Sequence, residues 1–221
     1  MIAVVTAGPA SAPIDDVRRI TNFASGEIGA LLSAALVAQG IEPLLLRARG
    51  ATCTEVPDGT LLHEFETNRD LARALEHLSE TRGANIRAVF HAAALSDYAV
   101  SAVRGPDGSL SGAHKIPGDL PQIHLVLEPA AKILPRLRAW FPHAWIAGWK
   151  YELEGAREDA VEAARAQLAQ GRTEATVLNG AAYGPGFGVL EGDKSPLHFA
   201  TKREVAQFLA SRASAFAKSH K

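Results

Sequence analysis

The sequence predicts an α/β fold in which helices cover both faces of a doubly wound, mostly parallel sheet. Short apolar runs alternate with longer runs of helical period, and hydrophobic residues make up 47% of the 221 residues. In addition, the first apolar run leads into a helix that starts at a glycine. These observations favour a single Rossmann-like domain over residues 1–221, with one flexible loop and short antiparallel strands added to the sheet.

Five apolar runs have the length and residue content of buried strands. They are Ile2–Ala7, Pro43–Ala48, Arg87–Ala93, His143–Trp149 and Glu174–Asn179. Four runs with apolar residues three or four positions apart predict helices at Gly26–Ala38, Asn68–Ser79, Gly155–Gln170 and Lys202–Ala217. Because strands and helices alternate, we expect parallel strands, with functional side chains just after their carboxyl ends.

Two segments depart from this alternation. Residues 103–121 contain four glycines and three prolines, which predicts a flexible loop on the ligand side of the sheet. After it, apolar residues alternate at Ile123, Leu125 and Leu127, and the runs 188–190 and 197–200 flank a turn. We interpret these short runs as antiparallel additions to the sheet edge.

Composition excludes several classes of function. The formal net charge is −1, from 23 Lys and Arg against 24 Asp and Glu, and no basic run is present. A nucleic-acid or anionic-membrane partner therefore has no electrostatic support. Cys53 is the only cysteine, which excludes an internal disulfide and a thiolate zinc cluster. Without a basic leader or a long apolar run, we expect no signal peptide, no membrane span and a cytoplasmic location.

The start of the first predicted helix is a candidate phosphate site. Ser25 and Gly26 lie at its first turn, where backbone N–H groups have no partner within the helix. These donors and the positive end of the helix dipole favour an anion, and a glycine lets the ligand approach closely. A structural interpretation is equally open: Ser25 would only cap the helix, and Gly26 and Gly29 would only allow close packing.

Three further candidates lie near strand ends or in the loop. Asp97 follows the third strand and could hold a metal ion or a ribose hydroxyl, or it could simply cap a turn. Lys115 could close over a bound phosphate, or it could be an ordinary solvated lysine. Trp149, at the end of the fourth strand, could stack on a nucleobase or anchor the core.

Read in order, these segments are similar to one family. Thr6-Ala7-Gly8-Pro9, Asn22 to Gly29, Ala92 to Tyr98, His114-Lys115-Ile116 and Gly148 to Glu152 follow one another at the spacing of that family. The chain resembles phosphopantothenoylcysteine synthetase, also called phosphopantothenate–cysteine ligase. This is the second activity of the bacterial bifunctional flavoproteins of coenzyme A biosynthesis.

The resemblance implies a ligase reaction in two steps. The carboxylate of 4′-phosphopantothenate attacks the α-phosphate of CTP or ATP, which gives an acyl nucleotidylate and pyrophosphate. The amine of cysteine then displaces the nucleoside monophosphate. The resemblance also implies a Mg²⁺ ion that accompanies the nucleotide, small-molecule substrates as the other partners, and a homodimer.

The resemblance assigns roles to residues by position. Asn22 and Lys115 would be catalytic, with Asn22 beside the acyl carbonyl and Lys115 on the triphosphate. The phosphate of phosphopantothenate would lie at Ser25, Gly26 and Gly29, and Asp97 would hold the metal. The residues expected to bind the nucleotide are Gly8, Ala93, Ala94, Asp97, Lys115, Trp149 and Lys150.

Departures from the family keep other functions open. Ala10-Ser11-Ala12 replaces a Thr-Arg-Glu type of stretch, Glu27 stands where a basic residue is common, and Lys115 is the only lysine of its loop. A non-catalytic homologue that binds a nucleotide or phosphate is therefore an alternative. A nicotinamide-dependent reductase is a weaker one, because Gly-x-Gly-x-x-Gly is absent and no tyrosine has a lysine four positions later.

Overall fold

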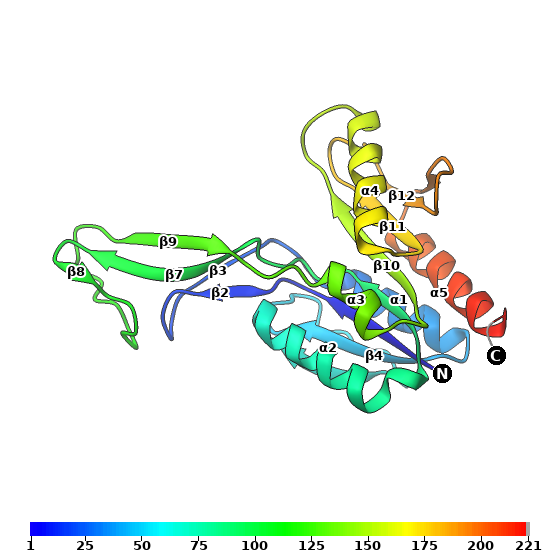
Figure 1. The fold of residues 1–221 in the computed structure, drawn as a ribbon, viewed down its shortest axis with the longest axis horizontal. Helices are drawn as coiled ribbons and strands as arrows, with labels where there is room; N and C mark the ends of the chain where they lie inside the picture. The colour runs from blue at the N-terminus through cyan, green and yellow to red at the C-terminus, as the bar shows by residue number, and fades with distance from the viewer. Residues whose placement is uncertain (220–221) are drawn as a thin grey trace.

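The computed structural model describes residues 1–219 and has an α/β body from which a long arm projects (Figure 1). Among these residues the body holds an eight-stranded sheet in the order β13-β12-β11-β10-β6-β1-β4-β5. The strands, in that order, are Leu197–Phe199, Phe187–Leu190, Ala175–Asn179, Trp145–Tyr151, Ile86–His91, Ile2–Ala7, Glu42–Ala48 and Leu61–Phe65. The six strands from β11 to β5 are parallel, and β12 and β13 are antiparallel.

Helices cover both faces of this sheet. On one face α1 (Glu27–Ala38) and α5 (Lys202–Ser219) pack over β1, β6 and β10. On the other lie α2 (Asn68–Arg82), α3 (Leu134–Trp140) and α4 (Arg157–Gly171), and the short 3-10 helix Gly83–Asn85 follows α2. The doubly wound arrangement predicted from the sequence is confirmed.

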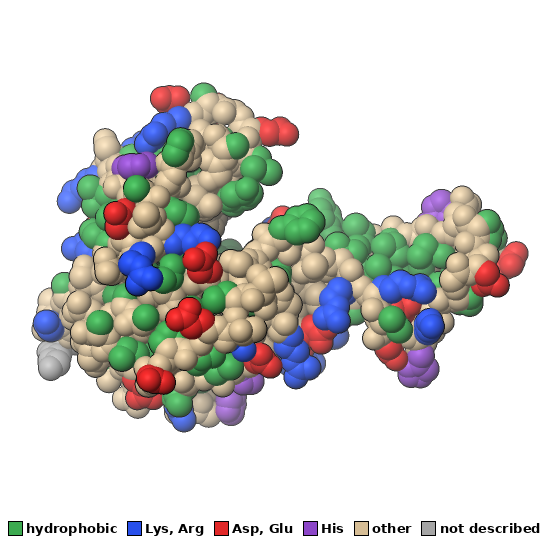
Figure 2. Space-filling view, turned by 180° about the vertical axis from the view of Figure 1, so that it is seen from behind, with side chains coloured by type: hydrophobic (Ala, Val, Ile, Leu, Met, Phe, Trp, Pro, Cys, Tyr) green, Lys and Arg blue, Asp and Glu red, His purple; other side chains and the backbone are tan. Residues whose placement is uncertain are grey.

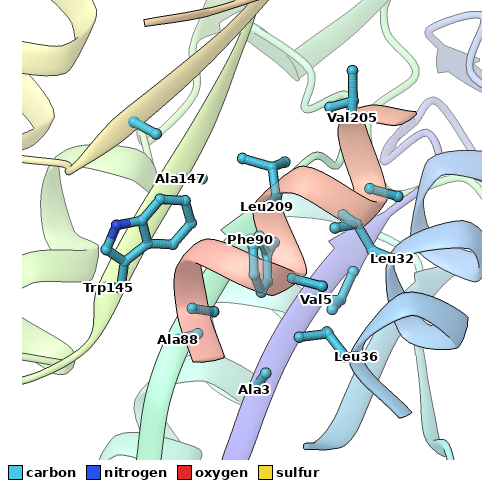
Figure 3. Close-up of a cluster of buried hydrophobic side chains, with 14 of the residues drawn as sticks. Ala3, Val5, Leu32, Leu36, Ala88, Phe90, Trp145, Ala147, Val205 and Leu209 are labelled. Atoms are coloured by element: carbon cyan, nitrogen blue, oxygen red, sulfur yellow. The ribbon is translucent and has the colours of Figure 1, made fainter. Parts of the chain in front are cut away.

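The core between the sheet and the α1/α5 layer is built from alternate strand positions. Val5 and Phe90 project from neighbouring strands toward Leu32 of α1 and Leu209 of α5, with Trp145 beside them (Figure 3). The Phe90 and Trp145 rings lie 5.7 Å apart between centroids in a tilted arrangement, which favours aromatic pairing. This packing fixes the strands whose carboxyl ends carry the candidate site.

The arm consists of two antiparallel ribbons. One is the hairpin of β2 (Ser11–Pro13) and β3 (Arg19–Thr21), which the chain forms between β1 and α1. The other is a three-stranded sheet of β7 (Tyr98–Gly105), β8 (Gly108–Ser109) and β9 (His124–Pro129). Figure 1 shows both ribbons running side by side away from the body, at the end opposite the two termini.

The structure corrects two predictions about the irregular segments. The run 188–190 pairs with 197–199 at the sheet edge, as expected, but the alternating run 123–127 forms β9 of the arm instead. The segment 103–121 is not loop throughout, because β7 extends to Gly105 and β8 follows it. Its remaining residues return along the arm and contact the β2–β3 turn.

One strand and one α-helix of the body were not predicted. In β5, the first four residues are exposed, so the strand lacks the buried apolar run that identifies its neighbours. Helix α3 has only seven residues and contains Pro135 in its first turn, which is too short for a helical period to be recognised. Within residues 1–219, no helix has both the length and the apolar character needed to cross a bilayer.

Candidate active site

The candidate site lies where the strand order reverses, between β1 and β6. In a doubly wound sheet this position opens a crevice at the carboxyl ends of the strands. The two strand exits are tied together: Ala94 N–H donates to the Gly8 carbonyl, and Ala10 N–H donates to the Ala94 carbonyl, each at 3.0 Å. Figure 2 shows the surface hollowed where the arm leaves the body.

Helix α1 points its N-terminus at this crevice without a side-chain cap. Gly26 is the N-cap residue and has a left-handed conformation, with φ of 81°. Among the described residues, no hydrogen bond engages the N–H groups of Gly26 and Ile28, whereas Glu27 N–H reaches the Ser25 hydroxyl at 3.3 Å. Two open amides at the positive end of a helix are suited to an anion.

Gly29, one of the residues expected at the phosphate, has a packing role in the structure. Its N–H already donates to the Gly26 carbonyl at 2.9 Å, so it is not free for a phosphate. A Cβ atom at this position would lie 2.4 Å from the Ala7 Cβ. Gly29 therefore allows α1 to approach β1 closely, as the third glycine of a dinucleotide fingerprint does.

The backbone N–H groups of Ala93 and Ala94, two residues expected to bind the nucleotide, take part in hydrogen bonds within the fold. Ala94 N–H donates to Gly8, and Ala93 N–H donates to the Thr6 hydroxyl at 3.2 Å. These hydrogen bonds fix the backbone at the exit of β6. The small, half-buried side chains of Ala93 and Ala94 still leave a surface against which a flat group could lie.

His91 stabilises the backbone at Ala93 through the Thr6 hydroxyl. Its Nδ1 lies 2.9 Å from the hydroxyl of fully buried Thr6, which also accepts the Ala93 N–H. The Thr6 proton has no other acceptor among the described residues, so the hydroxyl donates to His91 Nδ1. Burial lowers the pKa of His91 from 6.5 to about 4, and the imidazole is therefore neutral at physiological pH.

Two asparagines hold the exit of β6 at the crevice. Asn22 donates from Nδ2 to the Leu95 carbonyl at 2.9 Å, which brings the predicted catalytic amide to the predicted nucleotide segment. Asn68 donates to the Ser96 carbonyl at 2.8 Å and accepts the Ser96 N–H at 3.2 Å. Sequence reasoning missed Asn68, although its place directly after the Thr67 cap of α2 is a recognisable signal.

Asp97 stands at the outer rim of the crevice. Its backbone carbonyl accepts the Ala130 N–H at 2.8 Å, and its carboxylate contacts Lys132 Nζ. Within residues 1–219, no cluster of three or more His, Cys, Asp or Glu side chains could hold a metal ion.

Trp149 and Lys150 lie within β10 and not after it. The Trp149 side chain packs against the α1/α5 core, and its carbonyl accepts from Gln167 at 3.1 Å. This packing favours the core-anchor interpretation of Trp149, with part of the ring still exposed. Lys150 Nζ pairs with the Glu152 carboxylate at 2.7 Å.

Lys115 belongs to the segment between β8 and β9, and Figure 1 shows these two strands on the arm, away from the body. Asp15, in the β2–β3 turn, accepts the Ile116 N–H at 3.0 Å, and Asp16 accepts from His114 at 2.7 Å. These two contacts tie the segment around Lys115 to the β2–β3 turn.

Comparison with known proteins identifies the family. Residues 2–216 match the family described as the DNA/pantothenate metabolism flavoprotein C-terminal domain. The chain belongs to this family. The resemblance to the synthetase of the bifunctional coenzyme A flavoproteins is thereby confirmed at the level of the family.

Members of the family share both sequence and fold with the chain. It is 31% identical over 176 residues to the coenzyme A biosynthesis bifunctional protein CoaBC of Thermococcus kodakarensis, a match that covers 80% of the chain and 40% of that relative. A DNA/pantothenate metabolism flavoprotein from Streptococcus pneumoniae has a TM-score of 0.83 at 23% identity, covering 98% of this chain and 99% of its own. A Cab2 mutant in complex with phosphopantothenate-cysteine has a TM-score of 0.71 at 16% identity and covers 100% and 89%.

Glu27, the acidic residue that departs from the family pattern, is paired with a lysine. Glu27, in the first turn of α1, contacts the Lys202 ammonium group at the start of α5. A carboxylate alone would repel a phosphate at the helix end, but the ion pair cancels its charge. Glu27 is therefore no longer an argument for a degenerate phosphate site.

Proposed function

We propose that the chain is a ligase that joins 4′-phosphopantothenate to cysteine through an acyl nucleotidylate. The proposal rests on one observation in a member of this family: the Asn22 amide is anchored beside the open N-terminus of α1. The chain covers 40% of its bifunctional relative, so the activity concerns the synthetase half of such a protein. We expect it to act in the cytoplasm.

In the first step, a carboxylate oxygen of phosphopantothenate attacks the α-phosphorus of CTP or ATP. A new O–P bond forms and the bond to the β-phosphate bridging oxygen breaks, releasing pyrophosphate. The Gly26 and Ile28 amides, with Ser25, would bind the phosphate of phosphopantothenate at α1. A Mg²⁺ ion held by the nucleotide, with Asp97 as one possible ligand, would offset the charge of the leaving pyrophosphate.

In the second step, the amine of cysteine attacks the acyl carbonyl and the nucleoside monophosphate leaves with its oxygen. One N–H of Asn22 holds the Leu95 carbonyl, which leaves a second N–H and the amide oxygen. The free N–H can stabilise the developing oxyanion, and the amide oxygen can accept a proton of the attacking amine. The nucleotide itself would lie along the rim from Asp97 to Lys150.

The arm offers the surface for a homodimer. Val17, Ile20, Tyr98, Ile123 and Leu127 are exposed on its two ribbons, with Tyr98 53% and Leu127 44% exposed. Figure 2 shows hydrophobic side chains gathered along one side of the arm. An apolar strip of this kind favours association with a second copy. Such a pairing could carry Lys115 of one chain to the crevice of the other.

The test is release of pyrophosphate from CTP and from ATP, each with phosphopantothenate and with or without cysteine. We expect release that depends on phosphopantothenate, and formation of phosphopantothenoylcysteine when cysteine is present. A folded protein that binds neither nucleotide and releases no pyrophosphate would overturn the ligase in favour of a non-catalytic homologue.

A further inference from the structure

One cation at the crevice has no place in the roles assigned so far. Lys132 lies in the segment between β9 and α3, and its Nζ contacts the Asp97 carboxylate. The pair bridges two segments far apart in sequence, which the Ala130–Asp97 backbone hydrogen bond of 2.8 Å also ties together. Lys132 is thus held at the rim where Asp97 was predicted to meet the nucleotide.

The backbone next to Lys132 is anchored in the core, while its side chain is exposed. The next residue, Ile133, is 2% exposed and belongs to the core. Leu134 reaches β10, since a Cβ atom on Gly148 would lie 3.1 Å from Leu134 Cδ1. In contrast, the side chains of Lys132 and Asp97 are 66% and 71% exposed. A well-placed backbone therefore presents an exposed ammonium group beside Asp97, after the end of β6.

Other cations near this rim are engaged elsewhere. Lys150 pairs with Glu152 at 2.7 Å, and the Arg136 guanidinium lies 4.3 Å from the centroid of the Trp140 ring. Lys115 is docked on the arm. The partner of Lys132 is one exposed carboxylate, and an exposed ion pair contributes little stability, so Lys132 can exchange Asp97 for a phosphate at small cost.

We propose that Lys132 binds a phosphate of the nucleoside triphosphate and that Asp97 positions Lys132 before the nucleotide arrives. This inference rests on the proposed ligase function. It means that a lysine in the body of each chain contacts the triphosphate. A triphosphate needs several cations or N–H donors around it, and an ammonium group on a flexible stem can follow the phosphates as the reaction proceeds. When Lys132 turns to the phosphate, the Asp97 carboxylate becomes free for magnesium or a ribose hydroxyl.

The test is nucleotide binding by Lys132→Gln, measured by titration calorimetry with CTP and with ATP. We expect affinity for the nucleotide that the protein binds to fall about tenfold at low salt, and less at high salt, because the lost contact is electrostatic. Lys132→Arg should keep most of the affinity. In steady-state kinetics, KM for the nucleotide should rise more than kcat falls.

Two controls separate binding from folding. Phosphopantothenate affinity and the thermal midpoint should be unchanged in Lys132→Gln, and Lys194→Gln, in the turn between β12 and β13, should bind nucleotide like the unmodified protein. Unchanged nucleotide affinity in Lys132→Gln, or equal losses for both substrates, would overturn the proposal. A protein that binds no nucleotide before any substitution would instead overturn the ligase function itself.

Discussion

Burial turns His91 into a structural residue that resists protonation. The unfolded chain takes up a proton on this imidazole near pH 6.5, whereas the folded protein does so only near pH 4. Between these values the unfolded state binds more protons, so acidification favours unfolding. The contribution of His91 is complete above about pH 6.5, and about 3 kcal/mol is lost by pH 4.

His91→Asn should therefore flatten the dependence of stability on pH. An asparagine can keep an acceptor near the Thr6 hydroxyl, but it does not titrate. The free energy of unfolding would be measured with urea at intervals between pH 7 and 4.5. Its slope against pH should fall by the amount that corresponds to the uptake of about one proton on unfolding. His63→Asn, on the exposed strand β5, is the control and should keep that slope. An equal slope in His91→Asn would show that another group causes it.

Asn22 offers a test of the order of the two chemical steps. Asn22→Asp replaces the two N–H donors with a charged acceptor, which disfavours a developing oxyanion. We expect pyrophosphate release to continue while transfer to cysteine slows about a hundredfold, so that the acyl nucleotidylate accumulates. Quenched reactions analysed by mass spectrometry would reveal it. Normal rates of both steps would reduce Asn22 to a loop anchor, and absence of the intermediate would move its role to the first step.

At the scale of elements, two glycine substitutions can distinguish loss of the anion site at the start of α1 from the backbone strain of a left-handed residue. Gly26→Ala places a Cβ atom at a left-handed residue, 3.0 Å from the Ala51 Cβ, at the start of α1. Gly40→Ala imposes a similar left-handed strain, with φ of 71°, but with no atom within 4 Å. Each should cost about 1–2 kcal/mol of stability.

Only Gly26→Ala should then weaken phosphopantothenate binding, about tenfold or more in a calorimetric titration. The Gly40→Ala protein should bind it normally. If the nucleotide loses affinity in place of phosphopantothenate, the triphosphate lies at α1 and the assignment of the two substrates is reversed. Equal losses in both variants would mean that reduced stability is the cause.

Within the arm, Asp15 holds the β2–β3 turn to the segment around Ile116. The Ile116 N–H, followed by the Val17 and Arg18 amides, holds the pKa of this carboxyl below its usual 3.8. At neutral pH the ionised Asp15 carboxylate therefore accepts the hydrogen bond from the Ile116 N–H. This hydrogen bond weakens only as the pH falls through the lowered pKa of Asp15. Asp15→Asn should speed hydrogen exchange at the Ile116 amide at pH 7. Asp16→Asn, which loses an exposed contact, should leave that amide protected.

Most elements of the body could be predicted, because buried strands are short continuous apolar runs and helices repeat apolar residues three or four positions apart. Strand β1 is buried at every position, and α1 repeats apolar residues at helical spacing. The arm could not, because β7 has most of its residues at least partly exposed and no single face is defined by hydrophobicity. The place of Lys115 depends on the contact between Asp15 and Ile116, which lie 101 positions apart, and no local pattern encodes it.

For the whole molecule, the decisive question is whether the site is shared between two chains. Lys115→Ala and Asn22→Ala should each be inactive and stably folded. If Lys115 serves the crevice of a partner, mixed dimers contain one intact site, and equal mixing should restore about a quarter of the activity. Leu127→Asp should abolish this recovery by weakening the apolar strip, as followed by light scattering. No recovery from stable mixed dimers would place all residues of one site in one chain.

The path between β1 and α1 has a mechanical consequence. In a dinucleotide fold these elements are joined by a tight turn, but here residues 8–26 run out along the arm as β2 and β3 and come back at Asn22. The arm is thus a lever whose fulcrum is the pair of hydrogen bonds from Ala10 to Ala94 and from Asn22 to Leu95. A small tilt at the far end of the arm would turn the chain about these hydrogen bonds and change the orientation of the Asn22 amide, so contact with a second subunit would alter the geometry of acyl transfer.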